Sequence, residues 1–295
     1  MKAPSPTPLL LGFPDYRDQA LRLAKAAGLD YAEVEVHHFP DGESRIRLPA
    51  GIGERIILCR SLAQPNDKLI ELAMTSAAVR ELGARHLTLV APYLCYMRQD
   101  KAFRSGEAIS QPIIGQLLAN WVDELITVDP HLHRVATLEE AIPVQRAHCL
   151  TAAPLMASFL ATEMIDPILI GPDEEALQWV AAIAARSGLE YRIGLKQRHG
   201  DREVDIVFPQ PPPAGRHLVL VDDVASTGRT LEAAIAALAP SRPASISVLV
   251  THALFMESSL DRLERAGISH IWSTDSIPHS SNRLELAPLL ATALS

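Results

Sequence analysis

The sequence has few cysteines and no long apolar run. Its 295 residues include three cysteines, Cys59, Cys95 and Cys149, which are far apart and form no Cys-x-x-Cys pair. A disulfide framework or a zinc site is therefore not expected, and a reducing compartment fits the composition. No segment reaches the roughly 18 apolar residues of a membrane span, and the N-terminus lacks the apolar stretch of a signal peptide. We expect a cytoplasmic protein that does not contact membranes.

Basic residues are in the minority. There are 27 lysines and arginines against 35 aspartates and glutamates, which gives a formal net charge of -8. A general nucleic-acid binder needs a basic surface to displace the counterions of the phosphate backbone, so no nucleic-acid partner is expected. A small phosphorylated ligand needs only a few local donors and stays possible.

Apolar residues are plentiful and follow an alternating pattern. They make up 48% of the chain, which is ample for a buried core. Residues 55–59, an arginine followed by Ile-Ile-Leu-Cys, predict a buried strand. Residues 67–82 have a helical period, and residues 87–90 predict the next strand. Alternation of strand, helix and strand indicates a mainly parallel sheet with helices on its faces.

The two halves of the chain resemble each other. Residues 10–15 read Leu-Leu-Gly-Phe-Pro-Asp, and residues 169–173 read Leu-Ile-Gly-Pro-Asp. Each is followed by a helical segment that ends on a glycine, Gly28 in the first half and Gly188 in the second. We interpret the repeat as two similar α/β domains, at residues 8–145 and 146–295.

The segment at 218–230 predicts a phosphate site. An apolar strand at 218–221 is followed by two carboxylates, a turn of small residues and a helix from Thr230. Backbone N–H groups at such a helix start converge on one point and favour a phosphate dianion, while adjacent carboxylates suit sugar hydroxyls or Mg²⁺. The plain alternative is a strand–turn–helix with a threonine cap. The candidate residues are Asp222, Asp223, Ser226, Thr227, Gly228, Arg229 and Thr230.

Two further segments predict nucleotide binding. The turn Phe39-Pro40-Asp41-Gly42-Glu43 offers a ring that can stack on adenine and carboxylates that can accept from its amino group or from ribose. Pro-Asp-Gly is also a common β-turn. In the segment 92–101, two cations can neutralise ATP phosphates and an amide can bind a base edge; a solvated charged loop is the alternative. The candidate residues are Phe39, Asp41, Glu43, Arg98, Gln99 and Lys101.

The 218–230 segment resembles the ribose-5-phosphate loop that phosphoribosyltransferases share with ribose-phosphate diphosphokinases. The two nucleotide segments resemble the diphosphokinases alone. That resemblance implies two phosphoribosyltransferase-type domains and transfer of the diphosphoryl group of ATP to C1 of ribose 5-phosphate. It also implies Mg²⁺ near His131 and Asp173, a catalytic pair of Lys196 and Arg198, and a nucleotide turn that reaches in from a neighbouring subunit of at least a dimer.

Several positions depart from the commoner bacterial pattern. Glu174, Glu175 and Ala176 follow Asp173 where a Gly-Gly pair is usual, and Arg229 stands where glycine is usual. The Ser-Thr-Gly form of the sugar-phosphate loop, together with Phe103, is more similar to the archaeal-type branch. A phosphoribosyltransferase and a non-catalytic regulatory paralogue are the alternatives. The first has no use for the Arg98–Lys101 segment, and the second is expected to lose Lys196, Arg198 or the two aspartates.

Overall fold

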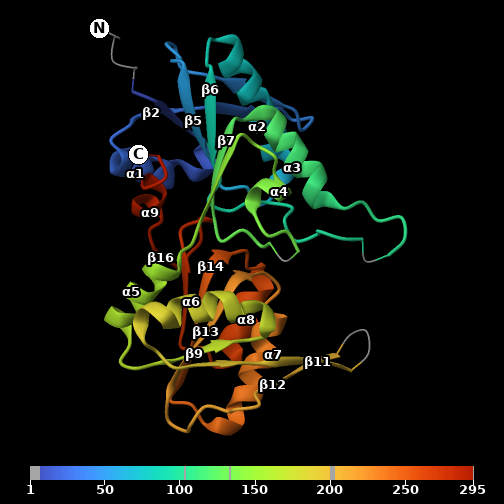
Figure 1. The fold of residues 1–295 in the computed structure, drawn as a ribbon, viewed down its shortest axis with the longest axis vertical. Coiled ribbons are helices and arrows are strands. Elements are labelled where there is room, and N and C mark those ends of the chain that lie inside the picture. Colours follow the sequence, from blue (N-terminus) through green and yellow to red (C-terminus); the bar gives the residue numbers. More distant parts are fainter. Residues whose placement is uncertain (1–6, 103, 133, 200–202, 295) are drawn as a thin grey trace. The chain divides into compact units, whose positions relative to one another are not determined.

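The chain folds as two compact units in a computed structural model, which describes residues 7–102, 104–132, 134–199 and 203–294 (Figure 1). Side chains at 197–199, 203–204 and 257 also lie outside the description. One unit comprises the described residues of Met1–Leu150 and Glu285–Ser295, and the other comprises Thr151–Leu284. The sequence had suggested a division at 145/146 with the chain end in the second domain. The structure instead divides the chain after Leu150 and places the last residues in the first unit.

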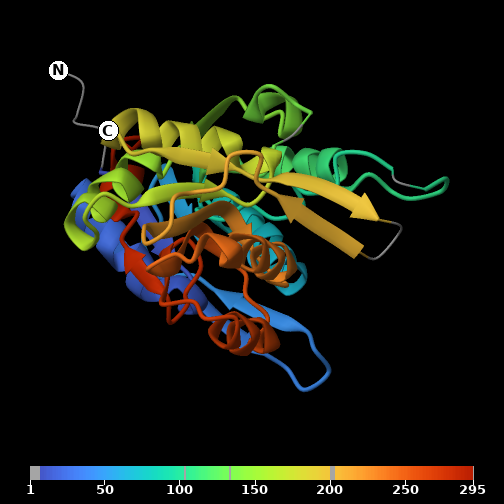
Figure 2. The same ribbon diagram turned by 90° about the horizontal axis from the view of Figure 1, so that it is seen from below.

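The first unit contains a parallel sheet of six strands, in the order β2-β1-β5-β6-β7-β8. Its strands are β1 (Leu9–Gly12), β2 (Asp30–Glu33), β5 (Arg55–Cys59), β6 (His86–Val90), β7 (Glu124–Val128) and β8 (Arg146–Leu150). The helices are η1 (Pro14–Tyr16), α1 (Arg17–Ala27), α2 (Pro65–Glu81), α3 (Ser110–Trp121), α4 (Leu138–Ala141) and α9 (Ala287–Ala291). The antiparallel hairpin β3 (Glu35–His38) and β4 (Ser44–Arg47) is separate from the sheet, and Figure 2 shows it projecting from the unit.

The second unit has a parallel sheet in the order β10-β9-β13-β14-β15-β16. Its strands are β9 (Ile168–Gly171), β10 (Tyr191–Ile193), β13 (His217–Ala225), β14 (Ser245–Ala253), β15 (His270–Thr274) and β16 (Asn282–Leu284). The helices are α5 (Ala153–Glu163), η2 (Glu174–Ala176), α6 (Leu177–Ser187), α7 (Arg229–Leu238), η3 (Ala239–Ser241) and α8 (Glu257–Arg265). A two-stranded ribbon, β11 (Leu195–His199) and β12 (Glu203–Val207), extends beyond this sheet (Figures 1 and 2).

The two strand orders match one for one, which confirms the prediction of two similar α/β domains. The sequence repeat has a packing reason. A Cβ on Gly12, at the end of β1, would lie 2.7 Å from the Tyr31 ring of β2, and a Cβ on Gly171, at the end of β9, would lie 2.6 Å from Ile193 of β10. Both first strands therefore end on glycine because the neighbouring strand places a large side chain over that position.

The strand order fixes where a ligand can bind. All strands of each sheet run in the same direction, so their carboxyl ends meet at one edge. The chain leaves the first strand to one side, for β2 or β10, and then continues on the other side, with β5 or β13. Open α/β sheets bind ligands outside the carboxyl ends at this topological switch point. The switch points lie between β1 and β5 and between β9 and β13.

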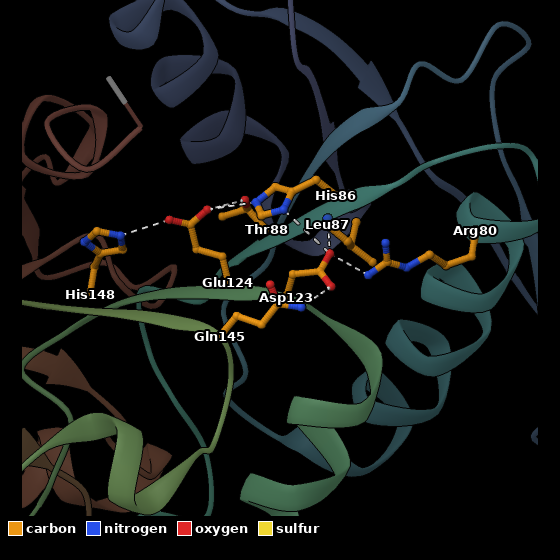
Figure 3. Close-up of polar contacts among 8 residues, drawn as sticks. All are labelled: Arg80, His86, Leu87, Thr88, Asp123, Glu124, Gln145 and His148. Carbon is orange, nitrogen blue, oxygen red and sulfur yellow. Dashed lines mark hydrogen bonds and ion pairs between the residues drawn. The ribbon is translucent and has the colours of Figure 1, made fainter.

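The opposite, amino edge of the first sheet carries a polar network (Figure 3). The Glu124 carboxylate at the start of β7 lies 3.1 Å from His86 Nε2, 2.9 Å from His148 Nε2 and 3.0 Å from Thr88 Oγ1. Burial alone would raise the pKa of Glu124, but the hydrogen bonds from His86, Thr88 and His148 lower it below its ordinary value. This carboxylate therefore links three neighbouring strands at an edge remote from the switch point.

Among the helices described, none has the length and apolar character to cross a membrane.

Candidate functional site at the carboxyl ends of the strands

The paired aspartates lie near the carboxyl end of β13, at the switch point of the second sheet. The strand does not end before them as predicted: β13 continues to Ala225 because it pairs with the long β14, with Val224 opposite His252. Asp222 Oδ1 accepts a hydrogen bond from the Asp223 N–H at 2.9 Å, and Asp223 Oδ1 accepts one from the Val224 N–H at 2.8 Å. The two carboxylates are thereby held at the edge where strand and loop meet.

Like charges converge on Asp222. Burial, the neighbouring Asp223 and then Asp173 raise the pKa of Asp222 well above its ordinary value. Asp173 follows β9, the strand next to β13, so the fold brings together carboxylates that are 49 and 50 residues apart in the sequence. A concentration of negative charge of this kind is relieved by a cation or by hydroxyl donors of a ligand.

The loop after the aspartates has the geometry of an anion site. Gly228, with φ of 73°, precedes α7, which begins at Arg229. No side chain caps this helix among the described residues, so its first N–H groups are open to an anion. Arg229 is exposed and Thr230 is half-buried. Ser226 and Thr227 complete the loop between strand and helix, as the sequence predicted.

Helix α8 holds this loop in place, a feature that the sequence did not indicate. The Ser226 carbonyl accepts hydrogen bonds from Ser259 Oγ at 3.1 Å and from the Met256 N–H at 3.3 Å. The Thr227 carbonyl accepts from Arg262 Nη2, and Arg262 Nε donates to Glu232 Oε1 of α7 at 3.0 Å. The loop carbonyls therefore point towards α8.

Two residues predicted for different roles meet in the second unit. Lys196 Nζ of β11 lies 3.3 Å from Asp173 Oδ2. Asp173 Oδ1 accepts from the Glu175 N–H at 3.1 Å and so caps the short helix η2. Arg198 lies on the same strand as Lys196, two residues on, and its side chain is outside the described part of the chain.

The carboxylates of Asp173, Asp222 and Asp223 are suitable Mg²⁺ ligands, with substrate oxygens filling the remaining coordination positions. Within the described residues, no group of three or more His, Cys, Asp or Glu side chains has the arrangement of a metal cage. Mg²⁺ commonly binds one or two carboxylates and takes its other ligands from phosphates and water. The pKa of Asp222, raised by burial and by two neighbouring carboxylates, fits this donor set because a bound cation would relieve the repulsion. His131 belongs to the first unit and is half-buried after β7.

In the first unit, the predicted nucleotide turn joins β3 to β4. The Phe39 N–H donates to the Glu43 carbonyl at 2.8 Å, and the Gly42 N–H donates to the Phe39 carbonyl at 3.0 Å. Gly42 has φ of 92°, a conformation that glycine adopts without strain. Asp41 Oδ1 accepts from the Glu43 N–H at 3.1 Å, while the Phe39 ring is exposed and forms a T-shaped pair with the His37 ring. The turn thus presents a ring and carboxylates to solvent.

The second predicted nucleotide segment follows β6. Arg98 and Lys101 are exposed, and Gln99 Oε1 accepts from Ser110 Oγ of α3 at 3.3 Å. Gln111, also on α3, donates its side-chain amide to the Met97 carbonyl at 3.3 Å. These contacts hold the segment against α3, and the two cations are exposed in the stretch of chain that follows β6.

Fold and strand-end residues together define a protein with two phosphoribosyltransferase-type domains. A family model of the N-terminal domain of ribose phosphate pyrophosphokinase matches residues 10–121, and a phosphoribosyl transferase domain model matches residues 153–278. A ribose-phosphate pyrophosphokinase of Methanopyrus kandleri is 34% identical over 92% of this chain and 94% of its own. One from Halobacterium salinarum is 32% identical over 97% and 100%.

The chain belongs to the ribose-phosphate pyrophosphokinase family, which is the diphosphokinase family named above. Both relatives are archaeal, in agreement with the predicted likeness to the archaeal-type branch. The fold is similar to that of a phosphoribosylpyrophosphate synthetase from Mycobacterium smegmatis, with a TM-score of 0.84, 21% identity, and coverage of 98% of this chain and 97% of that one.

Proposed function

We propose that the protein transfers the β,γ-diphosphoryl group of ATP to the C1 hydroxyl of ribose 5-phosphate, giving phosphoribosyl diphosphate and AMP. The family supports this activity. The observation that carries it is the pair Asp222 and Asp223 at the switch point, followed by an uncapped helix start. That arrangement suits one ligand with hydroxyls at one end and a phosphate at the other.

The sugar would bind in the second unit. Its 5-phosphate would accept hydrogen bonds from the N–H groups and hydroxyls of residues 226–230, and its 2- and 3-hydroxyls would donate to Asp222 and Asp223. Because α8 holds the loop carbonyls, the N–H groups of the loop need little rearrangement to meet the phosphate.

ATP would bind through the first unit. The exposed Phe39 ring offers a stacking surface for adenine, and Asp41 and Glu43 offer acceptors. Arg98 and Lys101 would neutralise phosphate charge, with Gln99 at the base edge. Mg²⁺ held near Asp173 and His131 would supply charge neutralisation of the phosphate oxygens.

In the transfer, the C1 oxygen forms a bond to the β-phosphorus as the bond from that phosphorus to the α,β-bridging oxygen breaks. AMP leaves with the bridging oxygen, and the proton of the C1 hydroxyl passes to solvent water. The protein's part is to position the two groups and to stabilise the negative charge. Lys196 is the charged donor that we assign to this stabilisation, with Arg198 beside it on the strand. We also propose a cytoplasmic homo-oligomer, at least a dimer.

The test is to incubate the purified protein with ATP, Mg²⁺ and ribose 5-phosphate and to quantify nucleotides by chromatography. We expect AMP and phosphoribosyl diphosphate in equal amounts, dependent on both the sugar and the metal. ADP as the nucleotide product would contradict the proposal, because it indicates transfer of the γ-phosphoryl group alone. No nucleotide product despite ATP binding would favour a regulatory paralogue.

A further inference from the structure

One buried carboxylate of α2 contacts both ends of the Phe39–Glu43 turn. Glu71 is fully buried. A single oxygen, Oε1, lies 2.7 Å from His38 Nε2 and accepts a hydrogen bond from Ser44 Oγ at 2.8 Å. His38 is the last residue of β3 and Ser44 is the first residue of β4, so the two contacts flank the turn on either side.

The second carboxylate oxygen links the turn to the central sheet. Glu71 Oε2 lies 2.6 Å from Nη2 of Arg60, a buried residue immediately after β5. Arg60 Nε donates to Asp15 Oδ1 at 2.9 Å, and its guanidinium lies 4.4 Å from the centre of the Phe13 ring. A continuous path of polar contacts therefore runs from the ends of β1 and β5 to the hairpin.

The charge of Glu71 is favoured in this setting. Burial by itself raises the pKa of the Glu71 carboxyl, but hydrogen bonds from His38, Ser44 and Arg60 outweigh burial and lower it. A buried carboxylate needs such partners to remain ionised. As an ionised group it accepts strong hydrogen bonds from both flanks of the turn at neutral pH.

The hairpin does not belong to the six-stranded sheet. It is an isolated two-stranded ribbon, and its residues are exposed or half-buried, so apolar packing contributes little to its position. Two-stranded hairpins are at best marginally stable alone in water. The contacts of Glu71 with His38 and Ser44 are therefore well placed to decide where the turn lies.

We propose that Glu71 is a positioning residue for the nucleotide: it holds the two ends of the turn and so sets where Phe39, Asp41 and Glu43 meet ATP. This inference rests on the proposed function, which assigns the turn to ATP. Among the described residues, the side-chain partners of Glu71 are His38, Ser44 and Arg60, and none of these is assigned to the phosphates or to the sugar, so we expect its effect to fall on ATP binding. The KM for ATP depends on it, and the KM for ribose 5-phosphate does not.

The test is Glu71→Gln, which keeps the shape of the side chain and removes its charge. We expect the KM for ATP to rise about tenfold, the effect of losing one charge-assisted hydrogen bond. The kcat and the KM for ribose 5-phosphate should stay within about twofold. Glu35→Gln is the matched control: Glu35 lies on the same hairpin, and its ion pairs among the described residues are with Arg47 at 3.4 Å and Arg45 at 3.8 Å, both within the hairpin. This control should leave the KM for ATP unchanged.

A second variant keeps the test decisive if Glu71→Gln does not fold by circular dichroism. Ser44→Ala removes one flank contact and leaves the Arg60–Glu71 pair intact, so a smaller rise of about threefold is expected. An unchanged KM for ATP in the folded variants would overturn the proposal. So would an equal rise in the KM for both substrates, which indicates a general structural role.

A separate readout distinguishes this proposal from the proposed function. If the wild-type protein forms no AMP, the proposed function fails. Hydrogen exchange of the turn amides still tests directly whether the contacts of Glu71 with His38 and Ser44 hold the turn. Faster exchange at residues 39 and 41–43 in Glu71→Gln than in wild type and in Glu35→Gln supports the positioning role. Equal exchange in all three proteins overturns it.

Discussion

Lys196 Nζ lies 3.3 Å from Asp173 Oδ2, so the ammonium assigned to the transferred phosphates pairs here with the carboxylate assigned to the metal. The two assignments are compatible if the ammonium exchanges one anionic partner for another. Lys196 lies on a ribbon that extends beyond the sheet, which suits such an exchange (Figure 2).

Lys196→Ala should lower kcat by about 10²–10³-fold, the effect of losing one electrostatic donor to a transition state. The KM for ribose 5-phosphate should change little, because the amino-acid residues assigned to the sugar lie on β13 and the loop after it. Lys196→Arg keeps the positive charge and should retain more activity. Steady-state rates of AMP formation check this, and near wild-type turnover in Lys196→Ala would remove the residue from the mechanism.

Asp222→Asn should stabilise the protein while abolishing activity. The raised pKa of Asp222, due to burial, Asp223 and Asp173, means that folding disfavours its charged form. Ionisation of Asp222 therefore destabilises the folded protein increasingly as pH rises above the ordinary carboxyl range. An asparagine, which does not ionise, avoids this destabilisation. We expect the Tm at pH 8 to rise by about 2–4 °C, the effect of 1 kcal/mol in a domain of 150–250 residues. A lower Tm by calorimetry would show that Asp222 is compensated in the folded protein.

Arg262→Met should weaken sugar binding. Arg262 donates to the Thr227 carbonyl and pairs with Glu232, so the apolar variant loosens the loop. Arg262 itself is not among the residues assigned to the sugar or its phosphate. We expect the KM for ribose 5-phosphate to rise about tenfold, which corresponds to 1.4 kcal/mol, with the KM for ATP unchanged. Arg265→Met is the control, because Arg265 bonds only the Asp261 carbonyl of its own helix among its described contacts. An equal effect in both variants would contradict a specific role for Arg262.

Glu124→Gln should lower stability in a pH-dependent way. The pKa of Glu124 is lower in the folded protein than its ordinary value of about 4.5, so ionised Glu124 stabilises the fold at pH values above 4.5. This stabilisation is lost as the pH falls through the pKa of the folded state. The variant should be less stable than wild type by about 1–3 kcal/mol from pH 8 to pH 5, as expected for a disrupted buried hydrogen-bond acceptor. The difference should shrink below pH 4.5. Urea unfolding at each pH measures it, and a difference independent of pH would refute the assignment.

The local features of both units could be predicted from the sequence. The strand at 55–59 has the predicted bounds, and the helix predicted at 67–82 corresponds to α2 at Pro65–Glu81. Strong apolar runs and helical periods report on these elements directly. The strand–loop–helix at 218–230 was also predictable, because its strand, carboxylates, small residues and helix are contiguous, whereas its ligand stays a prediction.

Features that depend on distant partners could not be predicted in this way. Glu71 lies next to Leu72 on α2 and is buried despite its charge, because Arg60, which follows β5, supplies the opposite charge. The support that Ser259 and Arg262 give to the loop arises only when α8 packs beside α7. The return of α9 to the first unit likewise depends on its packing against α1, where Leu290 becomes buried.

The matched strand orders give each unit an acidic residue after its first strand, and the two differ in what neutralises it. In the first unit, Asp15 is paired with Arg60 at 2.9 Å and with Lys68 at 2.8 Å, both anchored beside the same sheet. In the second, Asp173 has a lysine that arrives on an outlying ribbon. The carboxylate of the first unit therefore has two counterions next to its own sheet, whereas that of the second pairs with a lysine on a ribbon outside the sheet. The two units share a strand order and differ in how the acidic residue after the first strand is neutralised.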